Sequence, residues 1–368
     1  MSDHPVLPSY DGACITNLVP ALLHPGDAAP PWLPAVAEGA DQVVLLVIDG
    51  LGWNQLATRR ALVPTLAGLD GGPITTVAPS TTATALTSIS TGLPPGEHGV
   101  VGYRMAVHGE VLNVLRWSTA AGDARQTIPP TKVQMQAPFG GQRPPVVTRA
   151  EFAGSGFTLA HLEETRFTGY RTLGTLVAEV SRLAGAGEPF VYAYYEGLDK
   201  VSHEYGLGEQ YDEELRWIDH LVTTLLDRLP TGTVLLATAD HGQVEVPQDQ
   251  ILHLPAEVQT HVAMQSGEGR FRWLHARGGR VGALVEAARG SLGEHAWVRT
   301  RDEAIAEGWY GPTVTDAAAG RLGDVLLAAR RDVAFHDPND TGPYVLVGRH
   351  GSLTEDEMLV PLLAGVAG

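Results

Sequence analysis

Three runs of apolar residues limit the possible folds more than any other feature of the chain. They occupy residues 43–48, 190–195 and 233–238. Continuous apolar runs of this length are typical of strands that are buried on both faces of a parallel sheet. Residues 213–229, before the third run, have the pattern of an amphipathic helix. The sequence therefore predicts an α/β fold with a buried, largely parallel sheet.

The composition is typical of a globular, acidic protein. The chain has 368 residues, of which 44% are apolar, enough for the core of one large domain or two modest ones. It carries 25 Lys and Arg against 42 Asp and Glu, a net charge of −17. We therefore expect no general affinity for nucleic acid or anionic membranes, and an anionic substrate needs local cations.

The single cysteine and the N-terminal segment bear on the cellular compartment. Cys14 alone excludes an internal disulfide and a cage of thiolate metal ligands, and we expect it to be a small buried side chain. The first residues lack a basic region followed by a long apolar run, and no apolar run reaches 18 residues. We therefore expect a cytoplasmic protein without a membrane segment.

Acidic and histidine side chains follow each apolar run. They are Asp49 after the first run, Asp199 and His203 after the second, and Asp240 and His241 after the third. Open α/β sheets bind ligands at the carboxyl ends of their strands. Asp199 and His203 are four residues apart, so one helical turn directs both toward the same ion. Taken singly, Asp49 could cap a helix, and the Asp199–His203 pair could lie on a helix surface.

A segment rich in hydroxyl side chains, residues 78–92, is the candidate for the nucleophile. Pro79 disfavours a regular helix before it, and Ser80, Thr81 or Thr82 can cap the Ala-rich helix that follows. One hydroxyl then lies at the positive end of a helix, where an oxyanion costs less and free N–H groups can hold a phosphate. An ordinary capped helix is the alternative interpretation.

Two nearby features are interpreted as structural. His98 lies in a Gly- and Pro-rich loop, where a hydrogen bond to the loop backbone is its expected role, so it is left out of the metal set. Gly50 and Gly52 follow the first strand as in dinucleotide-binding proteins, but the third glycine of that motif is missing.

Residues 1–368 are expected to form a single catalytic domain, and the remaining segments are expected to be insertions or further strands of that domain. Residues 104–168 have no regular pattern, which is typical of an insertion or lid that sets substrate specificity. Residues 259–320 are expected to form a small α+β insertion. Strand-like runs at 324–329 and 344–347 are expected to return the chain to the sheet, and His350 follows the second of them.

The candidate ligands fit two metal sites. With one hydroxyl they supply seven oxygen and nitrogen ligands: Asp49, Asp199, His203, Asp240, His241, His350 and the hydroxyl. Zinc takes about four ligands in a tetrahedral site, and two ions can clamp the attacking and leaving oxygens of a phosphoryl displacement. We therefore expect two divalent ions, with zinc as the first choice and Mn²⁺ as the alternative.

The order of the motifs resembles the alkaline phosphatase superfamily, and within it the branch of type I phosphodiesterases and nucleotide pyrophosphatases. The motifs are D-G at 49, P-S-T-T at 79, T-G-x-x-P-x-x-H-G at 91, D-x-x-x-H at 199, A-D-H-G at 239 and H-G-S-L at 350. The resemblance spans residues 43–363. It implies a doubly wound sheet with helices on both faces and inserted lid segments.

The resemblance also implies residue roles. The nucleophile lies nine residues before the Thr of the T-G pair, which is Thr82 here, and Thr81 is the alternative if the count is wrong by one. The implied ligands of one ion are Asp49, Thr82, Asp240 and His241, and those of the other are Asp199, His203 and His350.

The implied function is metal-dependent hydrolysis of a small anionic phosphate ester through a phospho-threonine intermediate. Phosphodiester or pyrophosphate cleavage is the leading class. A phosphomonoesterase or phosphonate hydrolase of the same fold is the alternative, and a binding protein without turnover is a remote one. The sulfatase motif C-x-P-x-R is absent. The oligomeric state stays open.

One position departs from the family pattern. Family members carry an Asn about five residues after the H-G histidine, where it helps to hold the phosphoryl oxygen, but this chain has Tyr103 followed by Arg104. Tyr103 could donate its hydroxyl, stack on an aromatic group or simply pack, and Arg104 could bind a second negative charge. The insertion also contains aromatic residues that could contact an organic group of a diester: Trp117, Phe139, Phe152 and Phe157.

Overall fold

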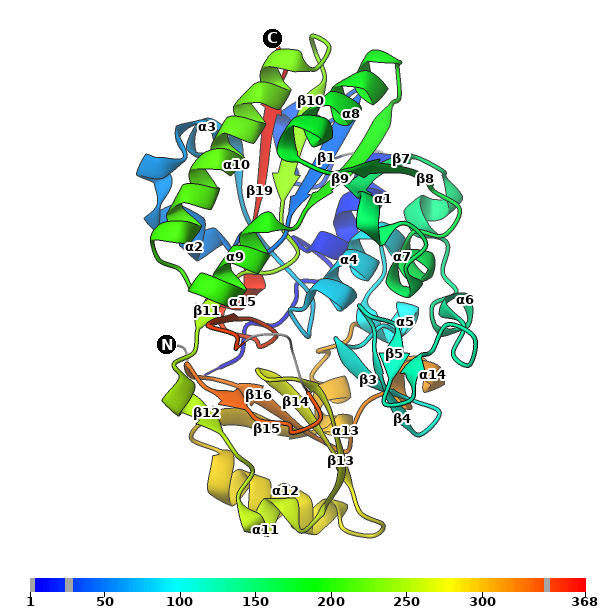
Figure 1. Ribbon diagram of the computed structural model, residues 1–368, viewed down its shortest axis with the longest axis vertical. Coiled ribbons are helices and arrows are strands. Elements are labelled where there is room, and N and C mark those ends of the chain that lie inside the picture. The colour runs from blue at the N-terminus through cyan, green and yellow to red at the C-terminus, as the bar shows by residue number, and fades with distance from the viewer. Residues whose placement is uncertain (1–3, 24–28, 341–344) are drawn as a thin grey trace.

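A seven-stranded mixed sheet forms the centre of the computed structural model, which describes residues 4–23, 29–340 and 345–368 (Figure 1). The strand order is β2 (Asp70–Thr75), β19 (Leu359–Val366), β10 (Val234–Thr238), β1 (Val43–Ile48), β9 (Phe190–Tyr195), β7 (Pro145–Arg149) and β8 (Arg166–Tyr170). The strands from β10 to β8 are parallel to one another, whereas β19 is antiparallel to both of its neighbours.

The three apolar runs are the three central strands, as predicted. β1 pairs in parallel with β10 on one side and with β9 on the other. Every residue of these three strands is buried, because helices cover both faces of the sheet. Their carboxyl ends therefore meet at one edge of the sheet.

Helices flank the sheet in front and behind (Figure 1). In front lie α8 (Leu173–Gly185), which begins with a capping box, and the amphipathic α10 (Glu209–Arg228). Other helices of this part include α1 (Leu18–Leu23), α2 (Trp53–Thr58), α3 (Pro64–Gly68), α4 (Thr82–Thr91) and α9 (Gly197–Tyr205). Among the helices of the described ranges, none is long and apolar enough to cross a membrane.

A second sheet of four antiparallel strands lies below the first in Figure 1. Its order is β13 (Val262–Glu268), β14 (Phe271–Ala276), β16 (Val325–Ala329) and β15 (Ala296–Thr300), with α11 (Ala256–Gln259), α12 (Val281–Leu292) and α13 (Arg301–Ala306) beside it. β16 corrects the expectation that residues 324–329 return to the main sheet. An apolar run shows that a strand is buried but not which sheet it joins.

The expected strand at 344–347 is also corrected. Tyr344 lies outside the described residues, and Val345 to Val347 form no strand. The chain pairs instead at β18 (Gly348–Arg349), which is antiparallel to β11 (Val244–Glu245). His350 therefore follows a two-residue strand outside the main sheet. A second short pair joins β12 (Ile251–Leu252) to β17 (Ala334–Phe335).

Residues 104–168 are only partly an insertion. A small antiparallel sheet comes first, made of β3 (Arg104–Val107), β4 (Glu110–Asn113), β5 (Ser118–Thr119) and β6 (Gly122–Asp123), and the helices α6 (Pro130–Val133) and α7 (Gly156–His161) follow. However, β7 and β8 belong to the main sheet, and β7 and the first three residues of β8 fall inside this range, which contradicts a lid over the whole of it. Both strands are short and contain polar residues, so they lack the long apolar run that marks the central strands.

A buried ion pair joins the second sheet to the segment before β19. Arg270, in the turn between β13 and β14, donates from Nε and Nη2 to the carboxylate of Glu357, with both distances 2.7 Å. Glu357 lies in α15 (Glu355–Met358) and also accepts the Ser352 backbone N–H at 2.9 Å. Neither charged side chain is exposed. The pair therefore fixes the loop that carries His350.

We expect Glu357→Gln to lower the free energy of unfolding by about 3–5 kcal/mol, because it leaves the buried Arg270 charge without a counter-charge. Urea unfolding measures the change. Glu213→Gln is the control, because Glu213 pairs with Arg216 on the exposed face of α10 and its loss should cost less than about 1 kcal/mol. Equal effects of the two substitutions would contradict a structural role for the buried pair.

Candidate functional site

The carboxyl ends of the three central strands bring the predicted acidic and histidine residues together. Asp49 directly follows β1, and Asp240 and His241 follow β10. Asp199 and His203 lie on α9, which begins just after β9. The topology of a parallel sheet places these segments side by side, although the chain separates them widely.

Two groups of ligand atoms share His241. Ligand atoms of Asp49, Asp240 and His241 lie within 4.8 Å of one another, and so do those of Asp199, His241 and His350. His241 Nε2 is 3.4 Å from Asp49 Oδ1 and 3.5 Å from Asp240 Oδ2. The His350 ring stacks on the His241 ring with 3.6 Å between centroids. These groups form one compact cluster.

The other two predicted ligands lie beside the cluster. His203 Nε2 is 3.3 Å from Asp199 Oδ2, and its ring centroid is 5.2 Å from that of His350. The Thr82 hydroxyl oxygen is 3.2 Å from His241 Nε2. The structure thus brings all seven predicted ligands together, and His350 reaches them from its loop.

Backbone carbonyls orient all three imidazoles of the cluster. The Nδ1 atoms lie 2.7 Å from the Gly348 carbonyl in His203, 3.1 Å from the Gly242 carbonyl in His241 and 3.0 Å from the Ser80 carbonyl in His350. Nδ1 must carry the proton to donate these bonds, which leaves Nε2 as the unprotonated acceptor atom of each ring. Metal-binding histidines are typically oriented in this way.

The carboxylates of Asp49 and Asp240 are buried against each other. Burial and then the neighbouring Asp240 and Asp199 raise the pKa of Asp49 well above its usual range, and burial also raises that of Asp240. Asp49 Oδ1 and Asp240 Oδ2 find no hydrogen-bond partner among the described residues. Buried carboxylate oxygens without partners are costly, and a divalent cation satisfies them.

The electrostatics of His350 agree with a ligand role. Burial, and then the adjacent His241 and His203, lower the pKa of His350 well below its usual range. The ring is therefore neutral, which is the state that binds a metal ion.

Two residues that sequence reasoning missed hold the carboxylates. Tyr194 in β9 donates its hydroxyl to Asp49 Oδ2, and Gln243 donates its side-chain N–H to Asp199 Oδ1. Gly50 must stay small, because a Cβ there lies 2.8 Å from the Gln243 amide nitrogen and its φ is +76°. Gln243 directly follows the A-D-H-G motif, and that position was the available signal. Tyr194 lies opposite Val47, which only the sheet register reveals.

The hydroxyl segment forms the predicted helix, α4, which is buried along its whole length. Thr81 is its N-cap residue, Thr82 is its first residue, and no side chain caps its start. Ser80 donates its hydroxyl to the Ser352 carbonyl at 2.6 Å, and Thr81 lies beside the buried Glu268 carboxyl. Of these three hydroxyls, that of Thr82 contacts a candidate metal ligand, and the positive end of α4 lies at the site.

His98 is structural, as expected. It accepts the Val100 backbone N–H on Nδ1 at 3.1 Å, and its Nε2 lies 2.9 Å from the Ser88 hydroxyl. Burial, followed by the charge of Arg321, lowers the pKa of His98 to about 3. A neutral histidine with both nitrogens engaged is unavailable to a metal ion.

Tyr103 and Arg104, the two residues at the position of the family's Asn, have different surroundings in the structure. Tyr103 lines a cavity beside Thr82, and its hydroxyl oxygen accepts the Asn113 side-chain N–H at 2.7 Å. Arg104 is buried, and its Nη1 lies 2.6 Å from Asp337 Oδ2. This corrects the expectation that Arg104 binds a second negative charge of the substrate, because its guanidinium already forms an ion pair with the Asp337 carboxylate.

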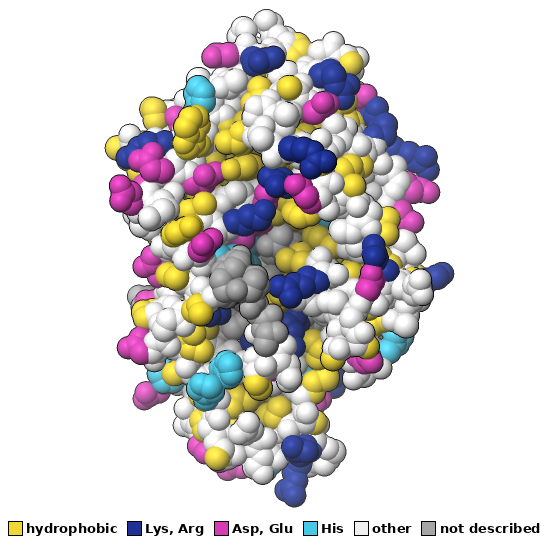
Figure 2. All heavy atoms as spheres, in the orientation of Figure 1, with side chains coloured by type: hydrophobic (Ala, Val, Ile, Leu, Met, Phe, Trp, Pro, Cys, Tyr) yellow, Lys and Arg dark blue, Asp and Glu magenta, His cyan; other side chains and the backbone are white. Residues whose placement is uncertain are grey.

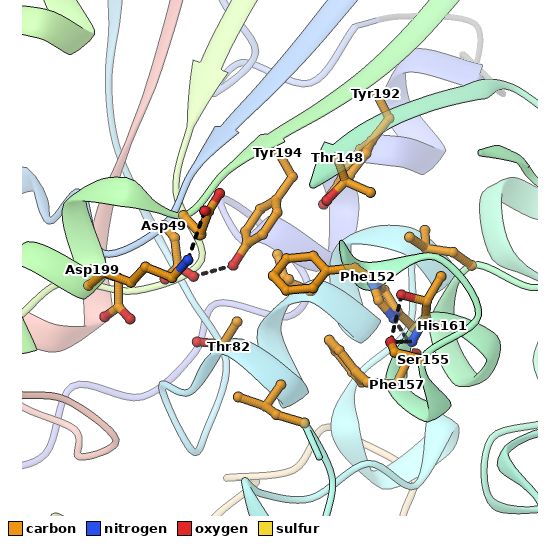
Figure 3. A pocket seen from close by; sticks show the side chains of 16 residues that line it. Asp49, Thr82, Thr148, Phe152, Ser155, Phe157, His161, Tyr192, Tyr194 and Asp199 are labelled. Carbon is orange, nitrogen blue, oxygen red and sulfur yellow. Dashed lines mark hydrogen bonds and ion pairs between the residues drawn. The ribbon is translucent and has the colours of Figure 1, made fainter. Parts of the chain in front are cut away.

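An apolar cavity of about 210 Å³ opens on one side of Thr82 (Figure 3). In Figure 3, Asp49, Asp199 and Thr82 lie at one end and Phe157 and His161 at the other. Phe152 and Phe157 line the cavity, as their aromatic character suggested. The other two aromatic candidates do not line it, because Trp117 is buried with its indole N–H bonded to the Ile128 carbonyl and Phe139 packs on strand β9.

A wider and more polar cavity also borders Thr82, and it shares Leu115, Asp199 and Lys200 with the apolar cavity. Its lining includes the ligands Asp199, His203 and His350, Tyr103, and the cations Arg116, Lys200, Arg270 and Arg349. Lys and Arg side chains are visible around the middle of the face in Figure 2. Thr82 thus borders both an apolar cavity and a wider one that is lined by charged residues of both signs.

The fold is shared with solved structures. Murine ectonucleotide pyrophosphatase / phosphodiesterase 5 is similar over 87% of each chain, with a TM-score of 0.66 and 16% identity. The human protein is similar over 88% of this chain and 87% of its own, with a TM-score of 0.66 and 17% identity. An inactive variant of the murine protein in complex with AMP has a TM-score of 0.65 and 16% identity over 88% of this chain and 87% of its own. These identities support a common fold, of the alkaline phosphatase type predicted from the motifs.

The family is shown by the sequence itself. Among curated proteins, no match to this chain is found. Residues 43–353, however, match the family described as type I phosphodiesterase / nucleotide pyrophosphatase, a range that starts with β1 and ends just after His350. It therefore contains every candidate ligand described above. The chain belongs to the type I phosphodiesterase / nucleotide pyrophosphatase family and is a hydrolase of that type.

Proposed function

We propose that this hydrolase uses two divalent metal ions and Thr82 as its nucleophile to cleave phosphodiester or pyrophosphate bonds. One observation carries the proposal. Thr82 begins a buried helix, and its hydroxyl oxygen lies 3.2 Å from Nε2 of the histidine that both ligand groups share. A nucleophile in that place faces the helix N–H groups and the cluster at once.

The residues present fit two ions. The proposed ligands are Asp49, Thr82, Asp240 and His241 for one ion and Asp199, His203 and His350 for the other. The unpartnered oxygens of Asp49 and Asp240 and the carbonyl contacts of the three Nδ1 atoms, which leave each Nε2 as the acceptor atom, support this assignment. A set of oxygen and nitrogen donors without thiolate suits zinc, with Mn²⁺ as the alternative. When bound, such an ion neutralises phosphate charge and lowers the pKa of a hydroxyl that it binds.

The reaction has two balanced halves. Thr82 Oγ1 loses its proton to solvent and forms a bond to phosphorus, while the bond from phosphorus to the leaving oxygen breaks and the electron pair stays on that oxygen. Water then attacks the phosphorus of phospho-Thr82, and Thr82 recovers a proton as the phosphate monoester leaves. The free N–H groups at the start of α4 bind the phosphoryl oxygens in both halves.

The apolar cavity supports a substrate with an organic group on the phosphate. A diester carries one less charge than a monoester and needs a surface for its second organic group. Phe152 and Phe157 offer such a surface next to Thr82. The variant of the murine relative that was solved with AMP supports a nucleotide as this organic group, since that relative has the same fold.

We expect the dialysed protein to retain two divalent ions per chain and to be stabilised by them. The raised pKa values of Asp49 and Asp240 favour folding while these carboxyls are protonated, so without metal this contribution is lost as the pH rises. The stabilisation by zinc should therefore be larger at about pH 8 than at about pH 5, because protons compete with the ion.

Metal analysis and thermal unfolding at both pH values test this expectation. Asp240→Asn should lose metal, whereas Asp123→Asn, in the exposed strand β6, should keep it. Fewer than about one tightly bound ion, with activity that is indifferent to chelator, would exclude the two-metal mechanism.

Thr82→Ala should lower kcat by more than about a thousandfold, because it removes the attacking atom. Its fold and most of its metal affinity should be kept, since an N-terminal helix hydroxyl contributes only about 1 kcal/mol. Thr81→Ala is the matched control, one residue away on the same helix start. If Thr81→Ala is inactive and Thr82→Ala turns over normally, the nucleophile is Thr81.

We expect bis(p-nitrophenyl) phosphate to have a higher kcat/KM than p-nitrophenyl phosphate. Phe157→Ala should reduce the advantage of the diester, because it removes part of the apolar surface, while Trp217→Ala on the exposed face of α10 should not. Tyr103→Ala tests whether this tyrosine replaces the family's Asn. A monoester preference of tenfold, about 1.4 kcal/mol of transition-state energy, would identify a phosphomonoesterase instead.

A further inference from the structure

The apolar cavity beside Thr82 has polar side chains at the end away from the metal ligands. Three of its lining residues are polar and buried: Thr148, His161 and Tyr192. In Figure 3 all three lie to the right of Tyr194, away from Asp199. None of them takes part in the chemistry proposed at Thr82, so their place in an otherwise apolar cavity points to a separate role.

Thr148 and Tyr192 reach the cavity from neighbouring strands of the main sheet. β7 is parallel to β9, and Val146 lies opposite Tyr192. Side chains alternate between the two faces of a sheet, so Thr148 points to the same face as Tyr192. The Tyr192 hydroxyl is buried and has no hydrogen-bond partner among the described residues. Burial raises the pKa of Tyr192, so this hydroxyl stays protonated and can donate.

His161 lines the same cavity from helix α7. Its Nδ1 lies 2.7 Å from the Phe157 carbonyl oxygen and must carry the proton to donate that bond. Burial lowers the pKa of His161 to about 4, so the ring is neutral at neutral pH. The ring stacks on that of Phe157, with 4.0 Å between centroids, which fixes its orientation. Nε2 is therefore an acceptor atom in a fixed place, and no hydrogen bond from the described part of the chain engages it.

These atoms determine which functions a bound group must offer. His161 Nε2 can only accept, so the group must present an N–H or O–H donor to it. The hydroxyls of Thr148 and Tyr192 can donate, so a carbonyl oxygen satisfies them. A group that lacks these functions leaves buried polar atoms unpaired, and a site of this kind therefore discriminates strongly against it.

The volume of the cavity limits the group to about one ring. An apolar cavity of about 150 Å³ holds one benzene molecule. The cavity beside Thr82 measures about 210 Å³, which leaves room for a ring with a small substituent. Phe152 and Phe157 line it, and aromatic walls favour an aromatic ring.

We propose that Tyr192, His161 and Thr148 select an organic group that is a single ring with both an N–H donor and a C=O acceptor. Aromatic amides and cyclic imides are rings of this class. The apolar walls bind the faces of the ring, and the three polar side chains bind its functional groups. The inference rests on the proposed function, because it specifies the organic group that lies next to Thr82.

A matched pair of phosphodiesters tests this selectivity. p-Nitrophenyl 4-carbamoylphenyl phosphate carries both functions, whereas its N,N-dimethylcarbamoyl counterpart lacks the N–H. With the metal-loaded enzyme, we expect release of p-nitrophenolate to have a kcat/KM at least about tenfold higher for the first ester. His161→Leu should reduce this ratio to less than about threefold, and His161→Gln, which keeps an acceptor, should restore part of it. A ratio that His161→Leu leaves unchanged would overturn the role of His161.

Tyr192→Phe separates recognition from structural damage. It should lower kcat/KM for the carbamoylphenyl ester by about tenfold and for p-nitrophenyl phenyl phosphate by less than about threefold. Thermal unfolding should not shift to lower temperature, because the folded protein loses no hydrogen bond of this hydroxyl. Tyr195→Phe is the matched control in the same strand: its hydroxyl donates to Glu214, so it should lower stability and leave the ratio of the two esters unchanged. Equal losses on both esters in Tyr192→Phe would contradict the proposal.

A second pair of substrates shows whether the ring is that of a nucleotide. The p-nitrophenyl ester of thymidine 5′-monophosphate carries a cyclic imide, and methylation of the imide nitrogen removes its N–H. A loss of at least about tenfold in kcat/KM on methylation would identify a pyrimidine nucleotide as the source of the ring. A loss of less than about threefold, together with selectivity between the carbamoylphenyl esters, would identify a non-nucleoside aryl ester.

A binding measurement separates this inference from the proposed function, because it needs no turnover. In ligand-observed NMR titrations, we expect benzamide to bind at least about threefold more tightly than N,N-dimethylbenzamide, and His161→Leu to remove the difference. That result without hydrolysis of any ester would contradict the proposed function and still support the polar recognition. If the wild type binds both amides equally, or neither of them, the inference is wrong, whatever esters the enzyme hydrolyses.

Discussion

The mutual repulsion of buried carboxylates is the constraint on which the rest of this structure depends. Asp49 and Asp240 lie side by side at the ends of neighbouring parallel strands, and Asp199 lies close enough to raise the pKa of Asp49. Hydrogen bonds from Tyr194 and from the Gly50 backbone relieve part of this cost. The remaining acceptor capacity is what makes the cluster a site for cations, because no Lys or Arg of the described residues forms an ion pair with these carboxylates.

The two ligand groups of the cluster are held by different parts of the fold. Asp49, Asp240 and His241 lie within three residues of the ends of buried central strands. His350 comes from a loop whose position depends on Arg270 and Glu357, and so on the second sheet. The position of the first ligand group therefore depends on the central sheet, whereas that of the second also depends on packing between two parts of the molecule.

The sequence predicted the chemistry of the site better than its setting. An apolar run predicts a buried strand, and an Asp or His shortly after it predicts a ligand. The strands β1, β9 and β10 and the ligands that follow them could therefore be recognised from the sequence. β2 and β19 could not, because Asp70 to Thr75 is rich in Gly and polar residues, and Pro361 disfavours a central strand. Arg104 was misjudged for another reason: its partner Asp337 lies more than two hundred residues away, and charge alone does not reveal such pairing.

The place of β19 in the main sheet has a consequence for how the protein is made. β2 has one neighbour in this sheet, and that neighbour is β19, near the end of the chain. Apart from a single bridge between Thr75 and Cys14, β2 therefore lacks a strand partner during synthesis until almost the whole protein has left the ribosome, although the segments on both sides of it in sequence can already fold. Pairing over so long a separation is slow, and an open strand edge attracts other chains. β2 is a poor template for such contacts because it begins with Asp70, Gly71, Gly72 and Pro73. The residues that prevent its prediction as a strand therefore also disfavour aggregation of the nascent chain.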